Sequence, residues 1–273
     1  MSAEKQTLSK LHNAYVYTNE GVPVLVSDLT YRVHNSDYGL YMDSQDLRFW
    51  ENFGYHRPTM LADLGSDLHP IGHQNETARH LSLVIENEPD LCLSPEEIGT
   101  LALASRMHDM GESMHPRIAE RTGAVVGDIP AGKKTDNQRL IEMRVRRYVY
   151  DQLLPDVHQD IIDRVELIIA HHDETILHEL FEVAHELQTF DTAKRAKSKW
   201  EEGIFHHHGQ VMHIQSDDGG RTSGLLGLHR AVFMRSGITL LKSYSHYNHV
   251  QSVLEPYLGE LERYVAYRDN QAA

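Results

Sequence analysis

The spacing of hydrophobic residues predicts helices along most of the chain from about residue 75 onward. Apolar side chains recur there every three or four positions, which places them on one face of a helix. Helices are predicted over 76–88, 137–153, 158–171 and 175–199, with another after Ser94 and one over the last fifty residues. Residues 13–31 are instead rich in β-branched and aromatic side chains around a turn at Asn19–Gly21. We therefore expect an all-α fold with a small β-hairpin or extended N-terminal arm and an extra C-terminal helix.

Polar segments interrupt this pattern and suggest how the chain is organised. We predict a short helix near 44–53 followed by a loop, and further loops over 113–136 and 203–224, where glycines are frequent. A loop as long as 113–136 inside a helical domain is more often functional than idle. The predicted parts are an N-terminal arm, hairpin and loop (1–74), a helical domain (75–200), and a loop with a helical extension packing on that domain (201–273).

The periodicity also predicts which side chains face the interior. The predicted inward residues are His80, Leu81, Val84 and Ile85; Leu140, Met143, Tyr148 and Leu153; and Ile161, Ile162, Val165, Ile168 and Ile169. Near the C-terminus, aromatic and aliphatic residues form a stripe from Tyr244 to Tyr264. Such a stripe is more often core or subunit interface than a ligand site, and we expect a homodimer or higher homo-oligomer.

Asp191 is the clearest sign of chemistry in the sequence. It continues a helical stripe at spacings of three and four, whose other members are Leu177, Leu180, Ala184 and Leu187. Asp191 therefore takes a position at which the periodicity demands an apolar residue. A carboxylate on such a face must be paired or coordinated.

A second polar interruption lies near the end of the helix that follows Ser94. Ser94-Pro95-Glu96-Glu97 is a capping box with proline at the first helical position. His108 and Asp109 continue the buried face of this helix and lie about 100° apart around its axis. The pair can offer a metal two adjacent ligands, although a hydrogen-bonded pair at a helix end is the simpler interpretation.

Taken together, four inward polar residues on three predicted helices suggest a metal site. His80, His108, Asp109 and Asp191 would supply two imidazoles and two carboxylates. That set suits Mn²⁺, Fe²⁺, Co²⁺, Ni²⁺ or Zn²⁺. Coordination positions would remain for water and a phosphoryl oxygen, which allows a hydrolytic reaction.

The amino-acid composition limits which binding partners and which cellular compartment we expect for this protein. The net charge of −14 disfavours a nucleic-acid polymer as partner, while a bound cation can still create a local site for a small anion. Cys92 is the single cysteine, so no internal disulfide can form and a reducing compartment is expected. No signal peptide opens the chain and no apolar run is long enough for a membrane span, so we expect a cytoplasmic protein without membrane partners. The chain has 20 histidines, so each one needs its own argument.

The order His80, His108-Asp109, Asp191 resembles the HD-domain phosphohydrolase superfamily. Within it, Glu112, Val126-Gly-Asp-Ile-Pro130, Lys134 and Glu142 are similar to the 5′-deoxynucleotidase branch. The segment from Phe181 to Ala196 resembles the final metal-binding helix of that branch. The resemblance covers roughly residues 75–200, and both ends of the chain lie outside it.

The resemblance implies an HD-domain helical bundle in which His80, His108, Asp109 and Asp191 hold the metal. Glu112 and Asp128 would then be the catalytic carboxylates that orient or deprotonate water and protonate the leaving 5′-oxygen. The implied substrate-binding residues are Lys134 and His172 at the phosphate, and Trp50 and Arg48 at the nucleotide. Because Glu142 stands where two-metal relatives carry an extra histidine, one metal is favoured.

Two departures and several alternatives accompany this interpretation. The segment between Glu112 and Gly127 is longer than in the family, and Arg48-Phe49-Trp50 lies farther upstream than the family's Arg-Trp pair. Taken alone, Glu112 fits a surface carboxylate, Asp128 a turn residue, Lys134 a solvated lysine, His172 a hydrogen-bonding histidine at a helix end, and Trp50 a core residue.

The expected activity is release of phosphate from (deoxy)nucleoside 5′-monophosphates by a metal-dependent nucleotidase. A nucleoside triphosphate or cyclic nucleotide could be the substrate of the same site. A di-iron oxygenase on the same fold is a further alternative, favoured by His171-His172 and disfavoured by Glu142. A non-enzymatic nucleotide sensor or scaffold is the alternative of another class.

Overall fold

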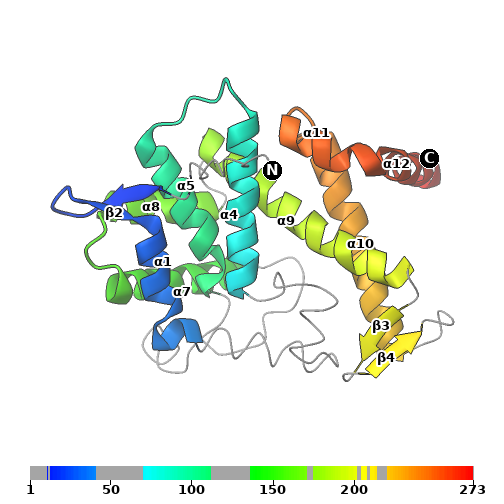
Figure 1. Cartoon of the computed structure of the whole chain (residues 1–273), viewed down its shortest axis with the longest axis horizontal. Helices are drawn as coiled ribbons and strands as arrows, with labels where there is room; N and C mark the ends of the chain where they lie inside the picture. Colours follow the sequence, from blue (N-terminus) through cyan, green and yellow to red (C-terminus); the bar gives the residue numbers. More distant parts are fainter. Residues whose placement is uncertain are drawn as a thin grey trace, which may run out of the picture. The chain divides into compact units, whose positions relative to one another are not determined.

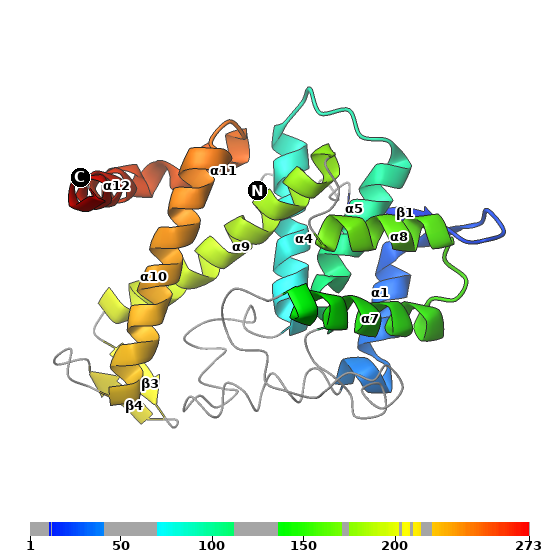
Figure 2. The same ribbon diagram turned by 180° about the vertical axis from the view of Figure 1, so that it is seen from behind.

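The described part of the chain is mostly helical, with two small antiparallel hairpins (Figure 1, Figure 2). The computed structural model describes residues 11, 13–40, 70–111, 136–170, 175–201, 204–207, 210–213 and 220–272. This confirms the expected all-α architecture with a small β-hairpin. Within these ranges, no helix combines the length and apolarity that a membrane crossing requires.

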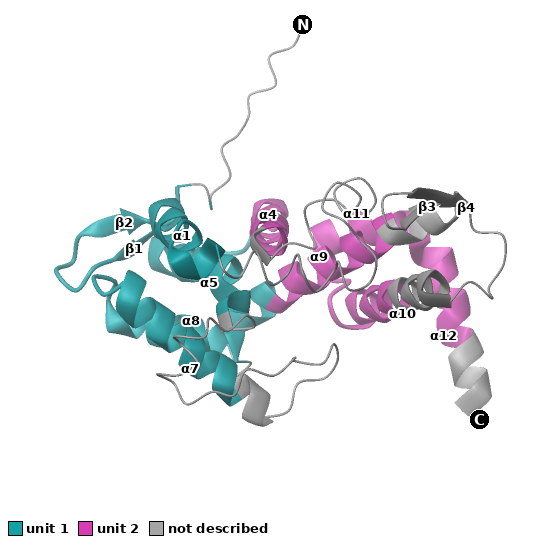
Figure 3. Ribbon diagram, turned by 90° about the horizontal axis from the view of Figure 1, so that it is seen from below, with its two compact units in different colours: residues 1–43, 89–181 teal, residues 44–88, 182–273 magenta. Residues whose placement is uncertain are grey.

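The chain forms two compact units, coloured separately in Figure 3. Unit 1 comprises residues 1–43 and 89–181, and unit 2 comprises residues 44–88 and 182–273. The last of the three boundaries, between residues 181 and 182, falls inside one continuous helix, α9 (Ile176–Glu201). The domain boundaries expected at residues 74 and 200 stay predictions.

The N-terminal hairpin of unit 1 consists of β1 (Tyr15–Tyr17) and β2 (Pro23–Leu25). Gly21 lies in the connecting turn with a φ of 77°, a conformation that glycine adopts without strain. The backbone amide of His158 donates to a β1 carbonyl at 2.9 Å and so attaches the hairpin to a later part of the unit. The predicted hairpin is confirmed, and α1 (Val26–His34) follows it directly.

Helix α5 (Pro95–Met107) begins at the predicted capping box. The Glu97 amide donates to Ser94 Oγ at 3.3 Å, and the Ser94 amide donates to Glu97 Oε2 at 2.8 Å. The helix packs against β1, α1 and α8 (Gln159–Ile169), and all its residues from 99 to 105 are buried. Burial around its whole circumference makes α5 the central helix of unit 1.

Helix α7 (Asp136–Leu153) packs against η2 (His108–Gly111), a short 3₁₀ helix, with a different face from the predicted one. The predicted inward residues Leu140, Met143, Tyr148 and Leu153 are half-buried or exposed, so that prediction is wrong. The buried side chains are Glu142, Val145, Arg146, Val149 and Tyr150. Two of them are charged, which means that polar contacts help to determine how α7 packs.

Three other predicted faces agree with the structure. On α4 (Pro70–Asn87) of unit 2, the side chains of His80, Leu81, Val84 and Ile85 are buried. On α8, the buried residues are Ile161, Ile162, Val165 and Ile168, while Ile169 is half-buried. On α9 they are Leu177, Leu180, Ala184 and Leu187.

Two predictions for the C-terminal part of the chain need correction. The segment 203–224, predicted as a loop, contains the hairpin β3 (Ile204–His207) and β4 (Gln210–His213) and the start of α10 (Gly220–Ser243). Both strand sequences contain β-branched residues and the first contains a phenylalanine, residue types that favour strands, although the surrounding sequence is polar. The expected single C-terminal helix is divided into α10, α11 (Asn248–Leu254), η3 (Glu255–Tyr257) and α12 (Leu258–Ala272). Pro256 contributes to the second break because it lacks an amide hydrogen.

An aromatic cluster forms the core of unit 2. Phe190 of α9 stacks on Phe233 of α10 with ring centroids 4.8 Å apart, and Tyr257 meets both rings edge-on at 5.6 Å. Tyr247, Val250, Leu254 and Leu261 of the predicted aromatic-aliphatic stripe are buried as well. Much of this stripe therefore serves as core, while Tyr264 at its end is exposed.

Candidate metal centre

In unit 2, Asp191 of α9 contacts His80 of α4. Asp191 follows the buried residues Ala184 and Leu187 on its helix, and 17% of its side-chain surface is exposed. His80 is 1% exposed, and its Nε2 lies 3.0 Å from Asp191 Oδ2. The structure thus brings together two of the four predicted ligands, an imidazole and a carboxylate.

Basic side chains also meet the Asp191 carboxylate. Lys194 Nζ donates to Oδ1, and Arg79 Nη2 lies 3.5 Å from Oδ2. Burial alone raises the pKa of the Asp191 carboxyl, but hydrogen bonds from His80 and Lys194 outweigh it and hold the pKa well below its usual range. The carboxyl is therefore ionised at neutral pH, which is the form that binds a metal.

Unit 2 holds further imidazoles, one of which lies beside His80. His73 of α4 and His185 of α9 meet edge to face, with ring centroids 5.3 Å apart. His249 of α11 places its Nε2 3.5 Å from His80 Nδ1. Burial lowers the pKa of His249 to about 4, so this ring is neutral at pH 7. Neutral imidazoles can bind metals or accept hydrogen bonds.

In unit 1, the doublet His108-Asp109 lies where α5 passes into η2. His108 is 6% exposed, and its Nε2 lies 3.3 Å from Asp109 Oδ2. His108 Nδ1 lies 3.0 Å from the Ser105 carbonyl oxygen, which can only accept a hydrogen bond. That contact favours a proton on Nδ1.

Side chains from two other parts of unit 1 hold the backbone of the doublet. Arg146 of α7 donates to Glu166 of α8 through Nε at 2.9 Å and Nη2 at 3.0 Å. Its Nη1 donates to the His108 carbonyl at 3.4 Å. Burial alone lowers the pKa of the Arg146 guanidinium, but Glu166 outweighs it and the net pKa is raised. Tyr38 donates its hydroxyl hydrogen to the Met110 carbonyl, so both carbonyls have side-chain donors.

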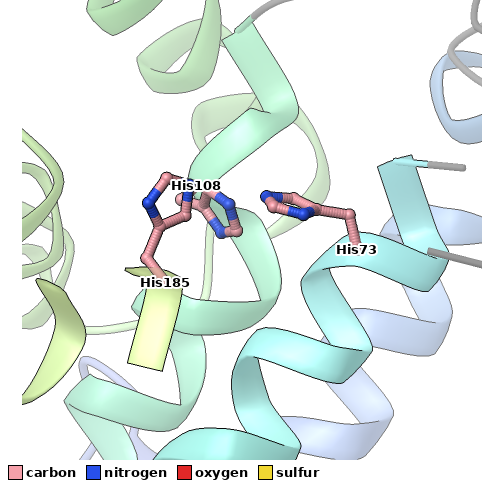
Figure 4. Close-up of side chains that lie close together, drawn as sticks. All are labelled: His73, His108 and His185. Carbon is pink, nitrogen blue, oxygen red and sulfur yellow. The ribbon is translucent and has the colours of Figure 1, made fainter. Parts of the chain in front are cut away.

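The two contacting pairs belong to different units, with His80 and Asp191 in unit 2 and His108 and Asp109 in unit 1. Three imidazoles, those of His73, His108 and His185, form a group that could hold a metal ion of unknown identity (Figure 4). A metal ion was expected, so the structure supports that expectation at this coarser level. His73 and His185 were not among the predicted ligands.

Six residues of the predicted site lie outside the described part of the chain. They are the catalytic candidates Glu112 and Asp128 and the substrate-binding candidates Arg48, Trp50, Lys134 and His172. Their roles therefore stay predictions. The short helix expected near 44–53 and the long loop at 113–136 likewise fall outside the described residues.

The sequence analysis missed His73, Arg146, His185 and His249. His73 precedes His80 by seven residues, which is two helical turns, so a longer predicted helix would have placed both on one face. Arg146 lies four residues after Glu142, three before Val149 and four before Tyr150, an alternative helical stripe that contains two charges. No local pattern marks His185 or His249, because their partners lie far away in sequence.

The side chains that are present fit a divalent transition metal. Within each unit, the contacting pair offers one imidazole nitrogen and one carboxylate oxygen, donor types that divalent metals accept. His80 faces Asp191 with its Nε2. Histidine binds metals through either Nε2 or Nδ1, so this nitrogen can serve as a ligand. Comparisons of the chain with protein-family models, with curated proteins and with solved structures find no match.

Proposed function

We propose that this protein is a metal-dependent phosphohydrolase acting on nucleotides, which releases phosphate from (deoxy)nucleoside 5′-monophosphates. The proposal rests on the resemblance of the sequence to HD-domain phosphohydrolases of the 5′-deoxynucleotidase branch. The contact between His80 and Asp191 is the observation that supports it most, because it joins the first and last residues of the motif. These residues are 111 positions apart in the chain (191 − 80), so no local structure requires them to meet.

We assign one divalent transition metal ion, Mn²⁺, Co²⁺, Fe²⁺, Ni²⁺ or Zn²⁺, to the four predicted ligands. These ligands are His80, His108, Asp109 and Asp191, as the resemblance implies. When bound, such an ion neutralises charge on a phosphoryl group and lowers the pKa of a water molecule. A second observation supports metal binding by this chain: His73, His108 and His185 form a group that could hold a metal ion.

Residues of this chain would handle the phosphate itself. Arg79 and Lys194 both bind the Asp191 carboxylate, and their side chains are 46% and 29% exposed. An exposed cation can exchange one anionic partner for another at low cost, so both can reach a phosphate group beside Asp191. This gives an acidic protein a local site for an anion.

The remaining roles follow the resemblance. Glu112 and Asp128 would orient or deprotonate the attacking water and protonate the leaving 5′-oxygen. Lys134 and His172 would contact phosphate, while Arg48 and Trp50 would hold the nucleoside. An acid, a base and fixed positive charge are what cleavage of a phosphate ester requires.

The proposal can be tested by counting metal ions and measuring turnover together. The full chain, loaded with Mn²⁺ or Co²⁺, is assayed for bound metal per chain and for phosphate release from a panel of nucleoside mono-, tri- and cyclic phosphates. Asp191→Ala is expected to lose bound metal and roughly 100-fold or more in kcat/KM. Glu112→Ala is expected to keep the metal and lose turnover. Asp151→Ala, at an exposed position of α7, is the matched control.

Other results would favour a different function. Two irons per chain with oxygen consumption would indicate the di-iron oxygenase. Tight nucleotide binding without turnover would indicate a sensor. A wild-type chain that retains no divalent metal and hydrolyses none of the nucleotides would contradict the proposal.

A further inference from the structure

The start of α11 is attached to the end of α4 within unit 2. Asn248 donates its side-chain amide hydrogens to the Asn87 carbonyl at 3.0 Å and to Glu88 Oε2 at 3.1 Å. Val250 and Leu254 of α11 are buried on the same short helix. Hydrogen bonds therefore hold the start of α11 at the end of α4, while the apolar side chains of α11 are buried.

This attachment places His249 beside His80. His249 Nε2 lies 3.5 Å from His80 Nδ1, the long end of hydrogen-bonding distance, and the two ring centroids are 5.8 Å apart. His249 is half-buried, whereas His80 is almost completely buried. The two residues are 169 positions apart, and His249 lies in the part of the chain that the family resemblance does not cover.

A buried imidazole that binds a metal through one nitrogen carries its proton on the other. That N–H needs an acceptor, and such second partners fix the ring orientation and the tautomer of metal-binding histidines. In His80, Nε2 faces Asp191 and Nδ1 faces His249. His249 Nε2 lies 3.5 Å from this nitrogen, and an imidazole nitrogen with a lone pair can accept the hydrogen bond.

We propose that His249 is a positioning residue of the metal centre, which accepts a hydrogen bond from His80 Nδ1 and keeps His80 Nε2 directed at the cation. The proposal rests on the proposed function only in that His80 binds a metal. It assigns the C-terminal extension a role in the site, because α11 supplies the imidazole that faces His80 Nδ1. Arg79 Nη2, 3.0 Å from His80 Nε2, is a donor there and cannot replace His249.

The test measures metal affinity rather than turnover. Co²⁺ alone is titrated into the metal-free full chain, and binding is followed by the absorption bands of the ion. His249→Ala is expected to weaken Co²⁺ binding roughly 10- to 100-fold and to change the absorption bands. His249→Gln, whose amide oxygen can accept the same hydrogen bond, is expected to recover part of the loss. His246→Ala is the matched control, because His246 is exposed and its ring lies at an angle to that of Tyr247 just before α11.

Each result bears on the proposal. Unchanged Co²⁺ affinity in His249→Ala overturns it and leaves the proposed function intact. Equal losses in His249→Ala and His249→Gln, together with a lowered Tm of both metal-free variants, would assign His249 a packing role and also overturn the proposal. If the wild-type chain itself binds no Co²⁺, Mn²⁺ or Zn²⁺, both this inference and the proposed function fail.

Discussion

The carboxylates of the two predicted pairs, His108–Asp109 and His80–Asp191, are similarly exposed, but the residues around them differ greatly in burial. The side chains of Asp109 in unit 1 and Asp191 in unit 2 are 15% and 17% exposed. Around Asp109, the backbone is held by Tyr38 and by an Arg146–Glu166 pair whose side chains are 4% and 3% exposed. Around Asp191, the partners besides His80 are Arg79 and Lys194, which are far more exposed.

This difference shows two ways in which a protein can accommodate a partly buried carboxylate. A buried ion pair stays in one geometry, because separating the charges leaves one of them unpaired in a poorly solvated place. An exposed lysine or arginine is weakly held and can leave when another ion arrives. We infer that the doublet in unit 1 is held rigidly, whereas Asp191 in unit 2 can exchange its partners.

The largest expected effect comes from breaking the buried pair in unit 1. Glu166→Ala leaves the Arg146 guanidinium buried without its carboxylate and is expected to lower the free energy of unfolding by about 3–5 kcal/mol. The neighbouring pair Arg147–Asp163 joins the same two helices at 2.6 Å, but its side chains are 39% and 48% exposed. Asp163→Ala is therefore the matched control, with an expected loss of about 1 kcal/mol or less.

Urea unfolding followed by circular dichroism measures both values. The double variant Arg146→Met with Glu166→Leu removes both charges and is expected to recover most of the lost stability. Equal losses in Glu166→Ala and Asp163→Ala would mean that the buried pair does not support unit 1 in the way described.

Much of the sequence interpretation that succeeded depended on local patterns. The capping box at Ser94 and the stripe that carries Asp191 are read within a few turns of one helix, and both are present. The face of α7 was predicted wrongly because charged residues were assigned to solvent by default. Arg146 is buried only because Glu166 of another helix pairs with it, a condition that hydropathy along α7 cannot express.

The candidate site shows the same limit. A pattern of residue types proposed the partners His80 and Asp191, but the contacts of His73 with His185 and of His80 with His249 arise from tertiary packing. Each involves imidazoles on helices distant in sequence, in a chain with 20 histidines. Spacing selected His80 but could not select His73, His185 and His249.

A second prediction compares how closely each unit is packed around a helical glycine. A methyl group added at Gly99 of α5 would collide with the backbone carbonyl of Tyr15, which cannot move without disturbing β1. At Gly237 of α10 it would lie 2.7 Å from Leu261 Cδ2 and 2.9 Å from Phe190 Cε2, both at the ends of side chains. Gly237→Ala is expected to cost about 1–3 kcal/mol and Gly99→Ala more than that.

Gly259→Ala serves as the reference for both variants, because nothing lies within 4 Å of a methyl group at that position. A helical glycine replaced by alanine without a clash gains roughly 0.5–1 kcal/mol. Thermal unfolding of the metal-free proteins gives the order of the three Tm values. If Gly237→Ala were the less stable of the two buried variants, unit 1 would not be the more rigid unit.

The smallest expected effect concerns the N-terminal cap of α5, the helix in unit 1 that leads to the His108-Asp109 doublet. Ser94→Ala removes the hydroxyl that accepts from the Glu97 amide and is expected to cost about 1 kcal/mol at pH 7. Ser27→Ala, at an exposed position in α1, should stay within about 0.5 kcal/mol of the wild type.

The pH dependence of this cost follows from Glu97. Hydrogen bonds from the amide and hydroxyl of Ser94 lower the pKa of the Glu97 carboxyl below its usual 4.5. A lowered pKa in the folded state means that the stabilisation is fully present above pH 4.5 and is lost as the pH falls through the folded-state pKa. The difference between wild type and Ser94→Ala, measured by urea unfolding, should therefore shrink between pH 5 and pH 3. A constant difference over that range would show that the carboxylate of Glu97 does not stabilise the cap, and that the hydroxyl of Ser94 acts alone.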